Sequence, residues 1–248
     1  MISRPTPIFS IITVCYNAAA TIEDTIQSVI SQTYHHIEYI IVDGGSKDGT
    51  MDIVRRYADR IAHIISEPDK GLYDAMNKGL RLATGDYVCF LNAGDEFHED
   101  DTLQLMVHSV KGDVLPDIMY GETEIVDHNG HFLRMRRHKA PEQLSWKSFR
   151  QGMMVCHQAF FCKRSIADEY NLRYRYSSDF DWCIRQLKKA QSIHNTHLVV
   201  IDYLDEGLTT RNRRASLVER LHIMAHHYGW LGTIARHLWF VVRLIVKR

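Results

Sequence analysis

The amino-acid sequence predicts an α/β protein with a mostly parallel central sheet flanked by helices. Apolar, β-branched stretches of strand length alternate with segments of helical periodicity through the first half of the chain. Each of these stretches is a continuous apolar run, which is typical of strands buried on both faces of a parallel sheet. The alternation weakens after about residue 110, where we expect a mixed arrangement.

The first half predicts four strands and three helices. Residues 8–16 form an apolar, β-branched run and are expected to be the first buried strand. A helix over 21–32 follows, because Thr21 is a suitable N-cap and apolar residues recur after it at helical spacing. The next elements in chain order are a strand over 37–42, a helix over 50–57, a strand over 61–66, a helix over 72–83 and a strand over 87–91.

The second half is less regular. The turn residues Asn129-Gly130 fall within a pair of expected strands. The elements predicted there are strands over 117–123, 124–134, 159–162 and 197–202, and helices over 165–170 and 180–190.

Composition excludes several classes of protein. The formal net charge is zero, so no global positive field favours nucleic acid. The five cysteines are odd in number and form no CxxC pair, which predicts reduced thiols in a cytoplasmic protein. The chain passes from Arg4 and Pro5 directly into an apolar strand, so we expect no secretory signal.

Polar residues follow each of the first four predicted strands. In open parallel sheets, ligands bind outside the carboxyl ends of the strands. Turns favour Asp, Asn and Gly in any case, but four polar ends on one edge exceed what turn chemistry explains. The four ends are Cys15-Tyr16-Asn17, the stretch 43–50, the stretch 67–71 and the stretch 92–96.

A carboxylate-lined edge suits a base or ribose, together with a divalent cation that bridges carboxylate and diphosphate. The glycine-rich turn at 44–49 matches neither GxGxxG nor GxxxxGK[ST]. The dinucleotide-binding and P-loop interpretations therefore lose support.

Three stretches of the sequence resemble family 2 glycosyltransferases with the GT-A fold, in particular bacterial transferases of exopolysaccharide and colanic-acid assembly. The stretches are SIITVCYN, IIVDGGSKDGT and SEPDKGLYDAMNKGLRLATGDYVCFLNAGDEF. The resemblance is dense over residues 8–97 and sparser over 157–210. It implies an inverting transferase that moves a sugar from a nucleoside diphosphate, expected to be UDP, to a glycan or lipid-linked acceptor in cell-surface polysaccharide biosynthesis.

The resemblance also implies roles for individual residues on the donor side. Asp43 would hydrogen-bond the nucleotide base, and Asp69 and Lys70 would flank the base and ribose. It further places Tyr16, Asn17 and Asn77 among the substrate-binding residues.

The metal-binding signature of such transferases matches Asn92-Ala93-Gly94-Asp95 here. Asp95 would hold a divalent metal, Mn²⁺ or Mg²⁺. Asn92 stands where many members carry Asp, so one charge is missing. An amide can still contact ribose or a metal-bound water.

The catalytic base of such transferases matches Asp179 in the stretch Ser178-Asp179-Phe180-Asp181-Trp182. An inverting transfer needs one carboxylate to take the proton of the acceptor hydroxyl. The alternative role for Asp179 is a helix N-cap. Asp181 is expected to bind substrate, or else to complement the helix dipole in the first turn.

Residues further along the chain are expected on the acceptor and diphosphate sides. His157 and Gln158 would line the acceptor side, although a core histidine is an equal alternative. Arg211, in a stretch that resembles a loop closing over the diphosphate, would contact that group unless the loop is merely solvated. His222, His226 and His227 have ligand-like spacing but lack a carboxylate motif, which favours an exposed helix face.

We expect one GT-A domain over 1–215, with a nucleotide-sugar half at 1–110 and an acceptor half at 111–215. A C-terminal helical extension over 216–248 should follow. Its apolar run is broken by Arg243 and is too short for a membrane span. An amphipathic helix over 230–248 on the inner face of the cytoplasmic membrane, a helix packed on the domain and a dimer contact remain open.

Two rival functions are weighed against this hypothesis. A sugar-nucleotide pyrophosphorylase needs a glycine-rich basic loop after the first strand, and the sequence there is Asn17-Ala18-Ala19-Ala20. A non-catalytic assembly subunit that keeps the fold is supported only by Asn92, and intact Asp43, Asp95 and Asp179 speak against it.

Overall fold

The computed structural model of the protein describes residues 6–205 and 212–234. Within them a nine-stranded sheet has the order β3-β2-β1-β4-β8-β6-β9-β5, and β7 pairs with β6 outside this path. The strands are β1 (Phe9–Cys15), β2 (Ile37–Asp43), β3 (His63–Ser66), β4 (Tyr87–Phe90), β5 (Glu96–Phe97), β6 (Ile118–Val126), β7 (Phe132–Met135), β8 (Phe160–Lys163) and β9 (Ile193–Leu204). The sheet thus runs through both predicted halves of the chain.

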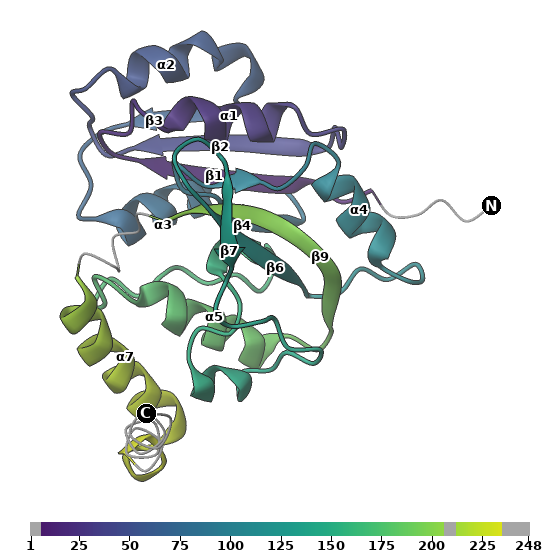
Figure 1. Ribbon diagram of the computed structural model, residues 1–248, viewed down its shortest axis with the longest axis vertical. Helices are drawn as coiled ribbons and strands as arrows, with labels where there is room; N and C mark the ends of the chain where they lie inside the picture. The colour runs from purple at the N-terminus through teal and green to yellow at the C-terminus, as the bar shows by residue number, and fades with distance from the viewer. Residues whose placement is uncertain (1–5, 206–211, 235–248) are drawn as a thin grey trace.

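Within the described residues, the chain forms six α-helices and three short 3₁₀ segments. The α-helices are α1 (Ile22–Ile30), α2 (Thr50–Arg56), α3 (Leu72–Leu82), α4 (Thr102–Ser109) and α5 (Ser178–Lys189), followed by α7 (Arg213–Tyr228). The 3₁₀ segments are η1 (Ala58–Arg60), η2 (Ser148–Gln151) and η3 (His157–Ala159). Figure 1 shows α1 and α2 on one side of β1–β3 and α3 on the other.

The first half is the predicted parallel arrangement. Strand β1 pairs in parallel with β2 and β4, and β2 pairs in parallel with β3. All seven residues of β1 are buried, as its continuous apolar run predicted. Helix α3 packs closely on this sheet because residue 79 is glycine: a Cβ there would overlap the side chain of Ile12. The carboxyl ends of these strands therefore lie at one edge, as the sequence predicted.

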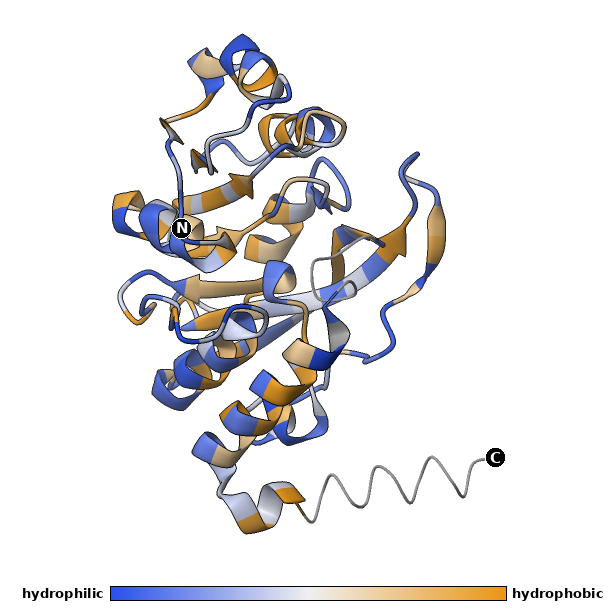
Figure 2. Cartoon of the chain, turned by 90° about the vertical axis from the view of Figure 1, so that its left-hand side faces the viewer, coloured by the Kyte–Doolittle hydropathy of each residue, from blue (hydrophilic) through white to orange (hydrophobic). Residues whose placement is uncertain are grey.

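The second half is mixed, also as predicted. Strand β8 is antiparallel to both β4 and β6, whereas β9 is parallel to β6. In Figure 2 the central strands are predominantly hydrophobic, and the helices carry hydrophobic and hydrophilic residues together. All five cysteines are buried free thiols.

The sequence-based prediction differs from the structure at three places. Residues 165–170 form turns and extended chain instead of a helix. Strand β6 continues through Glu124, so the two predicted strands do not divide there. Helix α4 and the short strand β5 were not predicted.

An aromatic stack joins α3 to α5 beneath the candidate site. The ring of Tyr170 lies parallel to that of Tyr73 at 5.3 Å and to that of Trp182 at 5.2 Å, measured between centroids. Phe90 meets both Tyr170 and Trp182 edge-on. Because all four rings are buried, this packing fixes the first turns of α3 and α5 relative to β4.

In the described part of the chain, no helix is both long enough and apolar enough to cross a bilayer.

Candidate active site

Asp179 lies in the first turn of α5 and faces α3 and η3. Its Oδ1 accepts a hydrogen bond of 3.0 Å from the Tyr73 hydroxyl, and its Oδ2 lies 3.6 Å from Nδ1 of His157. The side chain is 14% exposed, so the carboxylate can still be reached. The N-cap of α5 is Ser177, and no side chain caps the helix. The capping alternative for Asp179 is therefore not what the structure contains.

The two neighbours of Asp179 stay in defined protonation states. Burial raises the pKa of Tyr73 well above its usual range, and the nearby carboxylate of Asp179 raises it further. Tyr73 is thus a permanent hydrogen-bond donor near neutral pH. Burial lowers the pKa of His157, although Asp179 opposes the shift, so the imidazole is mainly neutral. Its Nε2 is buried and has no hydrogen-bond partner among the described residues.

Tyr73 is the residue that the sequence analysis missed. It falls in the stretch GLYDAMNKG, which the resemblance already included, but no role was assigned to it there. The signal that could have identified it is its place in the first turn of α3, directly after the Gly71 turn.

Asp95 is buried beside the carboxyl end of β4. Its Oδ2 accepts a hydrogen bond of 2.6 Å from Nε2 of Gln158, and its Oδ1 accepts one of 3.3 Å from the backbone N–H of Leu204. Burial raises the pKa of Asp95 to about 7, and the hydrogen bonds oppose the shift only in part. Gln158 is itself oriented, because its Oε1 accepts a hydrogen bond from the Cys156 thiol. Gln158, which is 1% exposed, holds Asp95 rather than lining an open surface.

The oxygen atoms at and near Asp95 are suitable ligands for a hard divalent cation. Asp95 forms no ion pair with any described residue, and the charge of Glu96 raises its pKa further. Oδ1 of Asn92 is buried and has no hydrogen-bond partner in the described chain. A buried carboxylate without a counter-charge and an unpaired amide oxygen are the ligand types that Mg²⁺ and Mn²⁺ prefer.

A second group of possible metal ligands is formed by His98, Glu124 and Asp202. One ligand atom from each lies within 4.8 Å of the others. Nδ1 of His98 already contacts Asp202 at 2.8 Å. Neighbouring strand residues face opposite sides of a sheet, so Asp202 and Tyr203 face opposite ways. Burial raises the pKa of Tyr203, and the nearby charges of Asp95 and Asp179 raise it further, so the Tyr203 side is the one that faces the candidate site.

Asp43 organises the loop that follows β2. It is fully buried, and its carboxylate accepts hydrogen bonds from the backbone N–H of Gly45 at 3.2 Å and from that of Ser46 at 3.0 Å. The hydroxyls of Ser46 and Ser66 also donate to it. Asp43 thereby ties the carboxyl ends of β2 and β3 together, and any contact with a base would compete with these bonds.

Tyr16, Gly44 and Asp69 converge at the same edge. A Cβ on Gly44 would overlap Oδ2 of Asp69 and would lie 3.4 Å from Cδ2 of Tyr16. The Tyr16 ring is 64% exposed, so its surface is available for stacking. Asn17 fixes this edge, because its backbone N–H donates to Ser46 Oγ at 2.7 Å and its Oδ1 accepts from Lys47 N at 3.0 Å. An exposed ring and a carboxylate on either side of bare backbone can hold a flat polar ring.

Lys70 lies at the rim of this edge. It is exposed, and its backbone N–H donates to Oδ2 of Asp74 at 3.0 Å. Its side chain is thus available to a ligand at the edge.

Asn77 is a correction to the sequence-based expectation. It is 1% exposed, and both of its amide atoms bond the backbone of Tyr170: Nδ2 donates to the carbonyl at 3.0 Å, and Oδ1 accepts from the N–H at 2.6 Å. No group of Asn77 remains for a substrate. The residue joins α3 to the segment that leads into α5.

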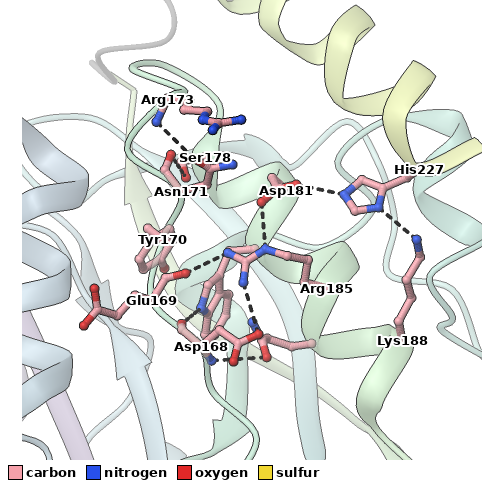
Figure 3. A network of polar contacts seen from close by, with 12 residues as sticks. Asp168, Glu169, Tyr170, Asn171, Arg173, Ser178, Asp181, Arg185, Lys188 and His227 are labelled. Atoms are coloured by element: carbon pink, nitrogen blue, oxygen red, sulfur yellow. Dashed lines mark hydrogen bonds and ion pairs between the residues drawn. The ribbon is translucent and has the colours of Figure 1, made fainter.

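Asp181 is a second correction. Its side chain is 3% exposed, and its carboxylate contacts Nε2 of His227 and Nε of Arg185, each at 2.8 Å (Figure 3). Residues two positions apart in an α-helix point about 200° away from each other around the helix axis, so Asp181 faces away from Asp179. Asp181 therefore docks α7 on α5 instead of meeting substrate.

His227 corrects the expected exposed helix face. Its side chain is 4% exposed, and its Nδ1 contacts Nζ of Lys188 at 2.9 Å (Figure 3). His222 and His226 are exposed, as expected. Arg211, the residue expected at the diphosphate, lies outside the described residues.

The sequence also matches known proteins. The sequence model of the family described as Glycosyl transferase family 2 matches residues 10–170. A "PGL/p-HBAD biosynthesis glycosyltransferase" of Mycobacterium bovis is 34% identical over 208 residues, which cover 81% of this chain and 78% of that protein. TuaG of Bacillus subtilis, named for teichuronic acid biosynthesis, is 44% identical over 97 residues, 38% of each chain.

Solved structures show the same fold. TarS of S. aureus, residues 1–349 in complex with UDP, superposes with a TM-score of 0.70 at 16% identity over 88% of this chain. The chain spans 64% of that TarS chain. The mannosyltransferase PcManGT of Pyrobaculum calidifontis, in complex with GDP-Man and Mn²⁺, has a TM-score of 0.61 at 20% identity and covers 95% of this chain and 74% of its own.

Proposed function

The chain belongs to glycosyltransferase family 2, and on that premise we propose that it is an inverting transferase that moves a sugar from a nucleoside diphosphate to an acceptor of the cell surface. UDP is the proposed nucleotide. The proposed acceptor is a glycan or a lipid-linked glycan. The enzyme is a glycosyltransferase of the GT-A fold, and the proposal concerns its stereochemistry, donor and acceptor.

The observation that carries the proposal is the setting of Asp179. Tyr73 occupies Oδ1, so Oδ2 is the oxygen that can take a proton. The acceptor hydroxyl loses its proton to Oδ2 as its oxygen bonds to the anomeric carbon and the bond from that carbon to the diphosphate breaks. No protein nucleophile takes part, so the configuration at the anomeric carbon inverts. Tyr73 keeps the carboxylate in place throughout.

The donor would lie along the carboxyl edge of β1–β4. We assign the base to the edge formed by Tyr16 and Asp69, with Asp43 shaping the loop beneath it and Asn17 and Lys70 at its rim. The solved complexes of TarS with UDP and UDP-GlcNAc and of PcManGT with GDP-Man support a nucleotide-sugar donor.

Asp95 and Asn92 would hold a divalent metal, Mn²⁺ or Mg²⁺, at the diphosphate. The Mn²⁺ in the PcManGT complex supports this assignment. When bound, the metal supplies Lewis-acid stabilisation of the departing diphosphate. Gln158 keeps the Asp95 carboxylate oriented for that purpose.

The acceptor is proposed from the relatives, which are named for PGL/p-HBAD and teichuronic acid biosynthesis. A contact with the membrane surface through residues 230–248 would bring the enzyme to such an acceptor. Large apolar side chains are exposed on α7 and just beyond it, which supports this contact. They are Leu217, Val218, Trp230, Leu231 and Ile234.

The proposal is tested first without an acceptor. UDP, GDP and dTDP are titrated into the full chain by calorimetry, with and without Mn²⁺, alongside Asp95→Ala. We expect UDP binding that needs Mn²⁺ and is lost in Asp95→Ala. Absence of binding by all three nucleotides would contradict the proposed donor chemistry.

A further inference from the structure

Arg136 directly follows β7 and is held by backbone carbonyls alone. Its Nη2 donates to the carbonyl of Met153 at 2.6 Å. Its Nη1 donates more weakly to the carbonyls of Met154 at 3.3 Å and His138 at 3.5 Å. The guanidinium is partly buried and forms no ion pair with any residue in the described ranges. Carbonyls fix the group but leave its full positive charge in place.

The same short segment connects Arg136 to the reacting centre. The carbonyls of Met153 and Met154 hold Arg136. His157 lies close to Asp179, and Gln158 donates a hydrogen bond to Asp95. Residues 153–158 thus connect the guanidinium of Arg136, the proposed catalytic base Asp179 and the buried carboxylate of Asp95. The charge of Arg136 also reaches this centre, since it adds to the effect of burial in lowering the pKa of His157.

We propose, on the basis of the proposed function, that Arg136 binds a phosphoryl group of a substrate beside Asp179. Guanidinium carries five N–H donors in a planar fork that matches phosphate oxygens, and the three carbonyls engage three of them. A partly desolvated cation without a carboxylate partner gains more from an oxyanion than an exposed one does. The charge of Arg136 acts on both His157 and Tyr203, whose pKa values also respond to Asp179.

Two phosphoryl groups fit this proposal. One is the diphosphate that leaves the donor sugar. The other is a phosphate carried by the acceptor, as in a phosphorylated lipid or polymer. Both present the same oxygens to Arg136, so they are separated by experiment.

The alternative is a purely structural role, in which Arg136 only joins the segment after β7 to residues 153–154. Arg136→Gln is chosen because an amide can still donate to a carbonyl but carries no charge. Arg136→Lys keeps the charge without the fork. Arg137→Gln is the matched control, since Arg137 is the exposed neighbour on the same segment.

The test measures three ligands by calorimetry with the full chain in the presence of Mn²⁺. UDP and uridine are titrated into the free protein, and inorganic phosphate into the UDP-saturated protein. If Arg136 contacts the diphosphate of the sugar donor, Arg136→Gln should weaken UDP binding at least about tenfold and leave uridine binding unchanged, with Arg136→Lys in between. If Arg136 contacts a phosphate of the acceptor, Arg136→Gln should leave UDP binding unchanged and lose phosphate binding. Arg137→Gln should match the wild type in every titration.

Unchanged UDP binding in Arg136→Gln, combined with phosphate binding that is unchanged or is absent from the wild type, would overturn the inference. Equal loss of UDP and uridine binding would also overturn it, because it would indicate that Arg136 has only a structural role. A wild type that binds neither UDP nor uridine would instead count against the proposed function, whatever the Arg136 variants do.

Discussion

The hydroxyl of Tyr73 lies 3.0 Å from Oδ1 of Asp179, across 106 residues of sequence. The contact joins the first turn of α3 to the first turn of α5. The stack of Tyr73, Tyr170 and Trp182 behind it holds both turns in place. The orientation of the carboxylate that we assign as the base is therefore a product of core packing as much as of the site itself.

Tyr73→Phe removes the hydroxyl but keeps the stacked ring. We expect kcat to fall by about tenfold, because the carboxylate loses the donor that fixes it. UDP affinity should stay within about twofold, since Tyr73 contacts the proposed catalytic base Asp179 and not the edge assigned to the nucleotide. Tyr57→Phe is the control, because its hydroxyl also donates to a carboxylate, that of Glu23. Equal kcat in the two variants would contradict a positioning role for Tyr73.

Asp95 gives the stability a pH dependence. Its pKa is raised from 3.8 to about 7 in the folded protein, so the folded state binds the proton more tightly than the unfolded chain. Its stabilising contribution is therefore complete below about pH 4 and is lost as the pH rises through about 7. In metal-free buffer, Asp95→Asn should gain stability relative to the wild type between about pH 5 and pH 8. Urea denaturation at both values measures this difference.

The same two proteins test the metal site. At about pH 8, Mn²⁺ should raise the urea midpoint of the wild type, because a ligand that binds only the folded state stabilises it. Asp95→Asn should show little of this increase. A midpoint that rises equally in both proteins would place the cation elsewhere, with His98, Glu124 and Asp202 the next residues to substitute.

His227 anchors α7 to α5 through the buried carboxylate of Asp181. His227→Ala removes one partner of that carboxylate and should cost about 1–3 kcal/mol in the free energy of unfolding. His226→Ala, at the exposed neighbouring position, should stay within about 0.5 kcal/mol of the wild type. Urea denaturation compares the two variants. Equal losses would show that the contact with Asp181 contributes little.

The membrane contact is tested by removing residues 230–248. We expect the protein to move from the membrane fraction to the soluble fraction of a cell lysate, because the deleted segment includes Trp230, Leu231 and Ile234, all exposed. Leu172→Ser is the control, since Leu172 is an exposed apolar residue on another segment. An unchanged distribution after the deletion would rule out this segment as the anchor.

The sequence predicted the first half of the fold because its strands are buried on both faces and read as unbroken apolar runs. It failed at residues 165–170, where local helix propensity was overridden by tertiary contacts. The indole N–H of Trp182 donates to the carbonyl of Asp168, and the side chain of Glu169 pairs with Arg81. These partners lie far away in the sequence and leave no local signal.

The candidate site shows the same limit. The resemblance identified Asp95 and Asp179 by their place in motifs, but a motif does not reveal which polar groups are already engaged by the fold. Asn77 is occupied by the backbone of Tyr170, and Asp181 by α7. Tyr73 was missed for the opposite reason, since one polar atom on a core ring has no periodic pattern.

The most direct test of the central claim compares Asp179→Asn with the wild type. Transfer of labelled sugar from a panel of UDP-sugars to a membrane glycolipid extract is measured, with UDP binding followed on the same samples. The account predicts transfer reduced by at least about a hundredfold in the variant, with UDP affinity near that of the wild type. Transfer at the wild-type rate would show that Asp179 does not take the acceptor proton, and the base would have to be sought among other residues.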